Sequence, residues 1–284
     1  MIARMQLGLA LAVLAIGCVG GGGIGTSDSP ARVVALAPSI VEMLYELDFG
    51  DRVVGVGDYA RWPVEVESLP RLGGLFDPRL ETIASLRPEL AILLPSEEKL
   101  ALQLRQLDIE VMTVANESLE DIEAMAVKIS ERLGDPERGE RFLGRWRASM
   151  RAQPRKGSLR VLLPVARQKG RVADIVVAGP GTFLDELLTL AGATNSMAGS
   201  PMPYPQVGLE EIVSRQPEVI VELQPSPGLY TDLVEDWRDL AGAGVFESTC
   251  VRVIAGDHVL IPGPRVPRLY RELRTALDSC TGSK

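Results

Sequence analysis

An internal repeat constrains the fold of this 284-residue chain more than any other feature. The segments Leu80–Ile92 (LETIASLRPELAI) and Leu209–Val221 (LEEIVSRQPEVIV) align at a constant offset of 129 residues. Each segment predicts a short helix that ends near a proline, because proline disfavours helical backbone at the residue before it. Each helix is followed by an apolar run typical of a buried strand, Leu90–Leu94 in the first copy and Val219–Leu223 in the second. A chain that carries such a unit twice is expected to fold into two similar α/β lobes.

Other parts of the two halves also correspond. Apolar runs at Arg32–Leu36 and Arg160–Leu163 predict a strand at the start of each half. Amphipathic patterns at Ile40–Leu47 and Phe183–Leu190 predict a helix in each half. Because strands that alternate with helices form βαβ units, the fold class is α/β with parallel sheets in both lobes.

A long helix is predicted between the lobes. Asp135 followed by Pro136 is typical of a helix start, and Glu137–Gln153 contains no proline. Apolar residues are spaced along one face of this helix, and they are Phe142, Leu143, Trp146 and Met150. A helix of about 18 residues spans about 27 Å, enough to brace two lobes. The predicted organisation is an N-terminal lobe at 31–134, a backbone helix at 135–156 and a C-terminal lobe at 157–284.

The N-terminus resembles an export signal with an anchor. Arg4 precedes the apolar run Leu7–Gly17, which stops at Cys18. This run is too short to cross a bilayer of about 30 Å but fits a secretory signal. Small residues directly before a cysteine resemble a bacterial lipoprotein signal, so we expect a signal peptide at 1–17, lipidation of Cys18 and a flexible tether at 18–30. The alternative is an ordinary cleaved signal with an incidental cysteine.

The remaining cysteines become interpretable if the protein is exported. Cys250 and Cys280 lie near the C-terminus, and an extracytoplasmic compartment permits disulfides. We predict that they pair, the alternative being two unpaired buried cysteines.

Composition excludes several functions. The 30 Lys and Arg residues against 38 Asp and Glu give a net charge of −8, which argues against a nucleic-acid partner. The single histidine, His258, excludes a His-rich zinc or haem-transfer cluster. The chain has no GxSxG or Walker A motif, and its one GxGxxG match, Gly20–Gly25, lies in the predicted tether. We therefore predict no enzyme, no catalytic residue, no resident cofactor and no metal site of its own.

A series of motifs in fixed order carries a family resemblance. The first is Arg32–Leu44 (RVVALAPSIVEML), followed by Leu72–Pro78 (LGGLFDP), Ala178–Phe183 (AGPGTF), Tyr204–Val207 (YPQV) and Pro262–Arg265 (PGPR). Together they resemble the helical-backbone substrate-binding proteins of bacterial importers for cobalamin and ferric siderophores, over about residues 31–278. The resemblance implies two lobes, a bracing helix, a ligand cleft between the lobes and docking on an ABC permease dimer with a cytoplasmic ATPase. We expect a monomer.

Two glutamates are predicted to dock on the permease. Glu81 and Glu210 occupy equivalent positions of the repeat, in the first turn of each helix. A carboxylate there could simply complement the helix dipole. The resemblance implies instead that one glutamate on each lobe contacts arginines of the two permease subunits.

The ligand is expected at loops that follow the carboxyl ends of the strands, where open α/β sheets bind ligands. The candidates are Ser39, Tyr59, Trp62, Leu75, Phe76, Leu94, Tyr204 and Arg265. The resemblance places Tyr204, and also Tyr59 with Trp62, near aromatic residues that contact cobalamin. Leu75 and Leu94 depart from it, because cobalamin binders show tryptophans there. For each aromatic residue the alternative is ordinary packing.

Three candidates have competing structural interpretations. Ser39 with Glu42 three residues later is typical of a capping box, so Ser39 is interpreted first as a helix cap. His258 could ligate a metal centre, but a lone histidine in a β-like run is more often packing or surface. Arg265 could pair with an anionic ligand or a cleft carboxylate, or be solvated.

These expectations combine into one function. The chain is predicted to be an exported lipoprotein that captures a cobalamin-type corrinoid or other metal chelate and delivers it to a permease. The alternatives are a ferric siderophore receptor of the same fold, a haem receptor, or an adhesion or scaffold lipoprotein without a transport role.

Overall fold

The computed structural model describes residues 31–152, 158–168, 174–226, 233–239, 246 and 249–281. The predicted signal peptide, the tether and Cys18 lie outside the described residues. The described residues all belong to one compact unit, Ala31–Lys284. Residues 31–134 are called the N-terminal half, and residues from 158 onward the C-terminal half.

The N-terminal half is built on a parallel four-stranded sheet of order β2-β1-β3-β4. The strands are β1 (Val33–Ala35), β2 (Val53–Val56), β3 (Leu90–Leu93) and β4 (Glu110–Thr113). The central strands β1 and β3 are apolar and buried throughout, as expected of a parallel sheet covered on both faces. The covering helices are α1 (Pro38–Glu46), α2 (Leu80–Ser85), α3 (Glu98–Arg105) and α4 (Leu119–Arg132).

Successive side chains of a strand point to opposite faces of the sheet, and different helices cover the two faces. Val33 and Ala35 share a hydrophobic cluster with α1 and α4. Val34, between them, points to the opposite face and packs with Ile83 of α2 and Leu104 of α3. The sheet is therefore the middle layer of three.

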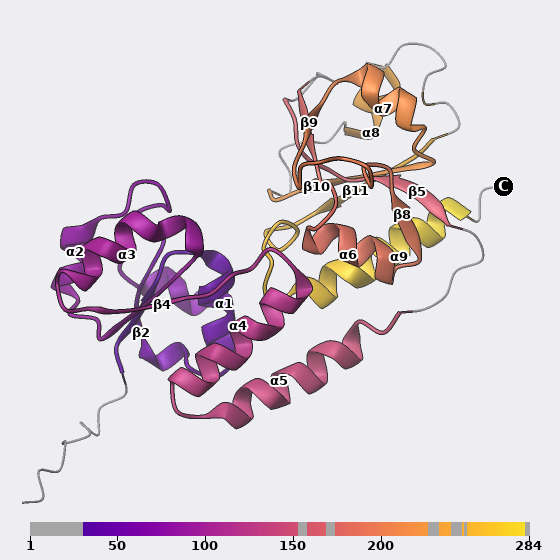
Figure 1. The fold of residues 1–284 in the computed structure, drawn as a ribbon. Coiled ribbons are helices and arrows are strands. Elements are labelled where there is room, and N and C mark those ends of the chain that lie inside the picture. Colours follow the sequence, from indigo (N-terminus) through magenta and orange to yellow (C-terminus); the bar gives the residue numbers. More distant parts are fainter. Residues whose placement is uncertain are drawn as a thin grey trace, which may run out of the picture. The chain divides into compact units, whose positions relative to one another are not determined.

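The predicted backbone helix is α5 (Pro136–Ser149), which runs beside α4 (Figure 1). Asp135 occupies the N-cap position and Pro136 the first turn, as predicted. Gly139 permits the close approach of the two helices, because a Cβ atom there would collide with the hydroxyl of Ser130 on α4. The helix has 14 residues, fewer than the predicted 18 or so, and ends at Ser149.

The C-terminal half contains a second parallel sheet of order β11-β10-β5-β8. These strands are β5 (Leu159–Leu162), β8 (Ala193–Asn195), β10 (Val219–Gln224) and β11 (Cys250–Ala255). A three-stranded antiparallel sheet that the sequence did not predict comprises β6 (Pro164–Ala166), β7 (Ile175–Val177) and β9 (Gln206–Val207).

Helices lie on both sides of this second parallel sheet (Figure 1). Helices α6 (Phe183–Leu190) and α9 (Val266–Thr281) share one hydrophobic cluster with Val221 of β10. Helices α7 (Leu209–Arg215) and α8 (Leu233–Asp239) pack on the other side with Ile220. Both halves therefore have the predicted α/β architecture, and α2-β3 and α7-β10 confirm the repeated helix–strand unit.

Cys250 and Cys280 form a disulfide with a Cα–Cα distance of 5.8 Å, as predicted. Among the described residues, no helix combines the length and apolar character needed to span a membrane.

Candidate functional site

Four predicted ligand-binding residues follow the carboxyl ends of strands in one sheet. Ser39 follows β1, Tyr59 and Trp62 follow β2, and Leu94 follows β3. Because these strands are parallel, their carboxyl ends lie at the same edge. The N-terminal half therefore brings these four residues to one edge, as the sequence predicted.

Two aromatic side chains beside this edge are exposed. Tyr59 is 70% exposed and Phe76 is 99% exposed. The ring of Tyr59 lies over Gly74, where a Cβ atom would be 3.3 Å from the tyrosine Cε2. Leu75 is only half-buried. The two loops thus present exposed aromatic surface to any large apolar ligand.

Ser39 does not cap its helix, which corrects the predicted capping box. Helix α1 begins at Pro38, so the N-cap position falls on Ala37 and Ser39 lies in the first turn. Proline favours the first helical position because its φ angle is fixed and it has no N–H to satisfy. The Ser39 hydroxyl accepts a hydrogen bond from Asn116 Nδ2 at 3.0 Å, and Glu42 bonds elsewhere.

Arg265 pairs with two carboxylates rather than being solvated. Its Nε donates to Glu42 Oε2 at 2.9 Å, and its Nη2 donates to Glu42 Oε1. Its Nη1 donates to Asp257 Oδ1 at 2.8 Å. The guanidinium also lies over the ring of Trp62, with Cζ 5.1 Å from a ring centroid. Burial raises the pKa of Glu42 to about 7, although the hydrogen bonds from Arg265 oppose this shift.

Tyr204 lies in the loop between β8 and β9 of the C-terminal half. Its ring is half-buried, whereas the neighbouring Met202 is 56% exposed. Burial raises the pKa of the Tyr204 phenol to about 12, and the charge of Glu117 adds to the shift. The hydroxyl therefore stays protonated and can donate a hydrogen bond.

Sequence reasoning missed Glu97, which is buried beside Leu94. Its Oε2 accepts a hydrogen bond from the Leu94 N–H at 2.7 Å, whereas its Oε1 is buried and has no hydrogen-bond partner among the described residues. Burial raises the pKa of Glu97 to about 7, partly opposed by that backbone hydrogen bond. The signal in the sequence was a glutamate three residues after Leu94, a spacing typical of a local cap.

The predicted docking residues occupy matching positions. Glu81 is exposed in the first turn of α2, and Glu210 is exposed in the first turn of α7. Neither carboxylate forms an ion pair within the part of the chain that the structure describes.

His258 lies in a turn after β11, not in a strand, and is completely buried. Its Nε2 lies 2.7 Å from Glu272 Oε2 on α9. The imidazole thus packs inside the C-terminal half, in agreement with the packing interpretation. No three His, Cys, Asp or Glu side chains of the described ranges are grouped so as to hold a metal ion.

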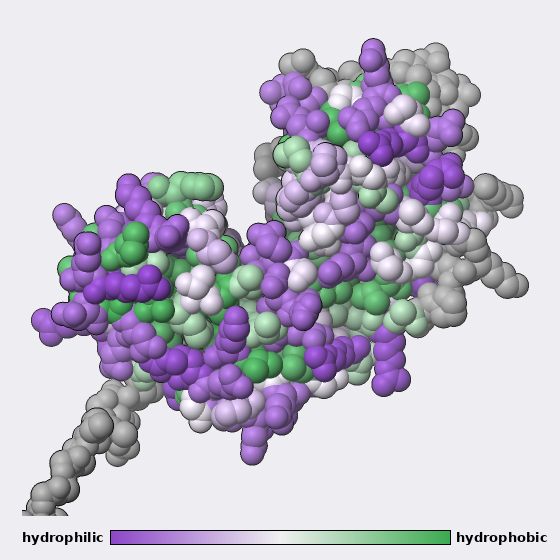
Figure 2. Space-filling model, in the orientation of Figure 1, coloured by the Kyte–Doolittle hydropathy of each residue, from purple (hydrophilic) through white to green (hydrophobic). Residues whose placement is uncertain are grey.

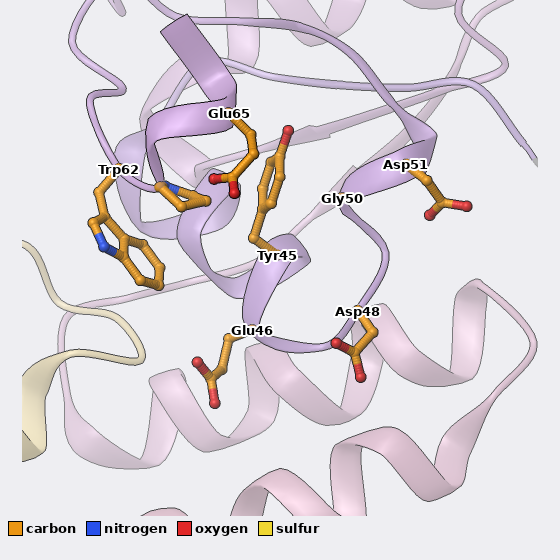
Figure 3. A pocket seen from close by; sticks show the side chains of 8 residues that line it. Tyr45, Glu46, Asp48, Gly50, Asp51, Trp62 and Glu65 are labelled. Atoms are coloured by element: carbon orange, nitrogen blue, oxygen red, sulfur yellow. The ribbon is translucent and has the colours of Figure 1, made fainter.

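A pocket of about 450 Å³ lies in the N-terminal half (Figure 3). Two aromatic residues and four carboxylates contribute to its lining, and they are Tyr45, Trp62, Glu46, Asp48, Asp51 and Glu65. Sequence reasoning missed this pocket because its lining residues are scattered over the end of α1, the residues that follow it and the segment after β2. Glu46 is already paired with Arg145, at 3.3 Å.

The face of the molecule that Figure 2 shows is mostly hydrophilic, with hydrophobic side chains in scattered groups.

Comparison with known proteins gives related sequences. The vitamin B12-binding protein of Vibrio parahaemolyticus is 29% identical over 191 residues, which are 66% of this chain and 69% of that protein. The vitamin B12-binding protein of Pectobacterium carotovorum is 28% identical over 218 residues, or 74% of this chain and 76% of the relative.

Solved structures share the fold. The periplasmic heme-binding protein RhuT from Roseiflexus, in apo form, superposes with a TM-score of 0.75 at 26% identity, covering 89% of this chain and 99% of RhuT. The periplasmic vitamin B12 binding protein BtuF of Vibrio cholerae gives a TM-score of 0.71 at 24% identity, covering 89% of this chain and 98% of BtuF. A family model described as "Periplasmic binding protein" matches residues 33–230. The chain therefore belongs to the periplasmic binding protein family, whose members are exported solute-binding proteins and not enzymes.

Proposed function

We propose that this protein captures a cobalamin-type corrinoid and delivers it to the permease of an ABC importer. The ligand is itself the metal chelate, so the protein needs no cofactor. We further propose that a lipid on Cys18 holds the mature chain at the membrane. The related sequences named vitamin B12-binding proteins support the corrinoid.

The exposure of Tyr59 and Phe76 is the observation that carries this proposal. Aromatic rings that are left in water at the carboxyl edge of a parallel sheet can cover the apolar face of a large flat ligand at little entropic cost. Leu75 and Leu94, both half-buried, would add apolar contacts, and Tyr204 with Met202 would add contacts from the C-terminal half.

Calorimetric titration tests the proposal. The full protein is purified from membranes, and its intact mass shows whether Cys18 carries a lipid. It is then titrated in parallel with cyanocobalamin, haemin and a ferric hydroxamate. We expect sub-micromolar binding of cyanocobalamin that weakens about tenfold or more in Tyr59→Ala, since a stacked aromatic contributes about 1–3 kcal/mol on burial. Binding of the hydroxamate alone would make the protein a ferric siderophore receptor, and binding of none would favour an adhesion or scaffold role.

Haem is the second candidate, supported by the likeness to RhuT and by the exposed phenol of Tyr59. A tyrosine oxygen can serve as an axial ligand of haem iron. The variant Tyr59→Phe separates the two ligands, because it keeps the ring and removes the oxygen. Haemin binding that Tyr59→Phe abolishes would replace the corrinoid by haem, whereas cyanocobalamin binding should survive this change.

We also propose that Glu81 and Glu210 dock on the permease. Reversing both charges with Glu81→Lys and Glu210→Lys should abolish ligand import into cells, because each lobe would then repel the basic groups of its permease subunit. The affinity for free ligand should stay within about twofold of wild type. Exposed Glu67 and Glu140 provide a matched control pair, since their reversal changes the net charge equally. Weakened ligand affinity in the Glu81/Glu210 variant would contradict a docking role.

A further inference from the structure

The guanidinium of Arg265 joins groups from both halves of the molecule. Glu42 lies on α1 of the N-terminal half, 223 residues away in the sequence. Asp257 lies in the C-terminal half, in the same β11–α9 loop as Arg265. Trp62, over which the guanidinium lies, also belongs to the N-terminal half. One side chain therefore bridges α1, the loop after β2 and the loop before α9.

Little of Arg265 remains available to a ligand. Three of its nitrogens donate to the two carboxylates, two of them as a fork on Glu42. The Arg265 side chain is only 10% exposed, and that of Glu42 is 1% exposed. A buried guanidinium with this geometry is a structural connector, since a forked arginine–carboxylate pair fixes both the distance and the orientation of its partners.

Backbone contacts near Arg265 also join the two halves. A Cβ atom on Gly263 would lie 3.5 Å from the Ser39 Cα, so the β11–α9 loop rests directly on the first turn of α1. The halves also meet where the Phe183 N–H donates to the Glu117 carbonyl at 2.8 Å. That second contact involves the starts of α4 and α6, different elements from those that Arg265 joins. The Arg265 bridge is thus an independent constraint on the arrangement of the halves.

We infer that Arg265 is a positioning residue that sets the separation of the two halves and orients Trp62, instead of contacting the ligand. The bridge holds α1, which carries Ser39 and Glu42, and the loop that carries Trp62 against the C-terminal half. Loss of the bridge should let the halves sample a wider range of separations. The binding-competent arrangement would then be less populated, and the apparent affinity for ligand would fall in proportion.

Distance measurement between spin labels tests this inference without any ligand. Labels are placed on the full chain at Lys99→Cys of α3 and Thr189→Cys of α6, both exposed, with Cys18→Ser to avoid a third label. The measurement is made at pH 8, where Glu42 is mostly ionised. We expect one narrow distance distribution in the parent protein and a clearly broader one in both Arg265→Gln and Glu42→Gln. Arg265→Lys, which keeps the charge but loses the fork, should give an intermediate width.

The control removes a forked pair that lies within one half. Arg132 forms such a pair with Glu110 on the surface of the N-terminal half, so Arg132→Gln should leave the distribution unchanged. An unchanged distribution in Arg265→Gln would overturn the inference. If both bridge variants fail to fold, the comparison of Arg265→Lys with the parent protein decides.

A second experiment measures affinity for the ligand that binds the wild-type protein. This experiment rests on the proposed function. Arg265→Gln and Glu42→Gln should each weaken binding about tenfold, and the double variant should be no weaker than either single variant. A direct ligand contact predicts otherwise: Arg265→Gln would lose affinity while Glu42→Gln kept it, and the inference would fall. Absence of binding in the wild-type protein would refute the proposed function but leave the distance result intact.

Discussion

Replacing Arg167 with alanine is expected to lower the free energy of unfolding by about 3–5 kcal/mol, because it leaves a buried charge without its partner. The Nε and Nη2 of Arg167 donate to the two carboxylate oxygens of Glu222 at 2.9 and 3.2 Å, and its Nη1 donates to Asp236 at 3.0 Å. The Arg167 and Glu222 side chains are each only 1% exposed. Glu222 would keep its hydrogen bonds from Trp237 and Gln224, both at 2.8 Å, but not its counter-charge.

A control variant separates the effect of burial from the effect of losing a forked arginine–carboxylate pair. Arg132 and Glu110 form a fork of the same kind, but their side chains are 38% and 51% exposed. Arg132→Ala should therefore cost less than about 1 kcal/mol. Urea unfolding followed by tryptophan fluorescence measures both variants. Adding Glu222→Gln to Arg167→Ala should recover part of the loss, since glutamine keeps an acceptor for Trp237 without the charge. Equal losses for Arg167→Ala and Arg132→Ala would contradict this account.

Local signals in the sequence predicted the helices and strands that dominate the fold. Helix α6 has the predicted bounds, Phe183–Leu190, because its apolar periodicity and its Thr182 cap act within one short segment. The repeat correctly predicted α2-β3 and α7-β10. The antiparallel sheet was missed because β9 has only two residues, too few to show a period.

Tertiary contacts explain most of the differences between the predicted and the observed structure. Helix α5 ends before its predicted end, and the carbonyl of Arg151 accepts a hydrogen bond from the Tyr270 hydroxyl at 3.0 Å instead of from a helical N–H. The spacing of Ser39 and Glu42 favoured a local cap, but Glu42 pairs with an arginine that no local pattern connects to it.

The candidate site was predictable only in part, because its side-chain contacts are also tertiary. Strand ends could be located from apolar runs, so Ser39, Tyr59, Trp62 and Leu94 were placed correctly at one edge of a sheet. What each side chain contacts depends on the partner half. Arg265 illustrates this, because its sequence context left open an anionic ligand, a carboxylate or solvent, and only the fold brings Glu42 and Trp62 to it.

Removing the disulfide is expected to destabilise the chain by about 3–4 kcal/mol, the value for closing a loop of about 30 residues in the chain-entropy model. The bond joins Cys250 at the start of β11 to Cys280 in the last turn of α9. It restricts the unfolded chain, whereas the folded helix is already anchored by Leu273 and Leu277, both buried. The folded structure should therefore survive the change while the unfolded state gains conformational entropy.

Guanidinium unfolding of Cys250→Ala/Cys280→Ala measures this loss, and reductant should produce a similar shift in the wild-type protein. Reductant should have no further effect on the double variant, and Cys18→Ser should leave the reductant response unchanged because Cys18 is not part of the bond. A wild-type midpoint that reductant does not move, together with two free thiols by mass in the unreduced protein, would refute the pairing. Because 3–4 kcal/mol is a large share of the 5–15 kcal/mol that stabilises a typical protein, folding in an oxidising compartment contributes directly to the stability of this chain.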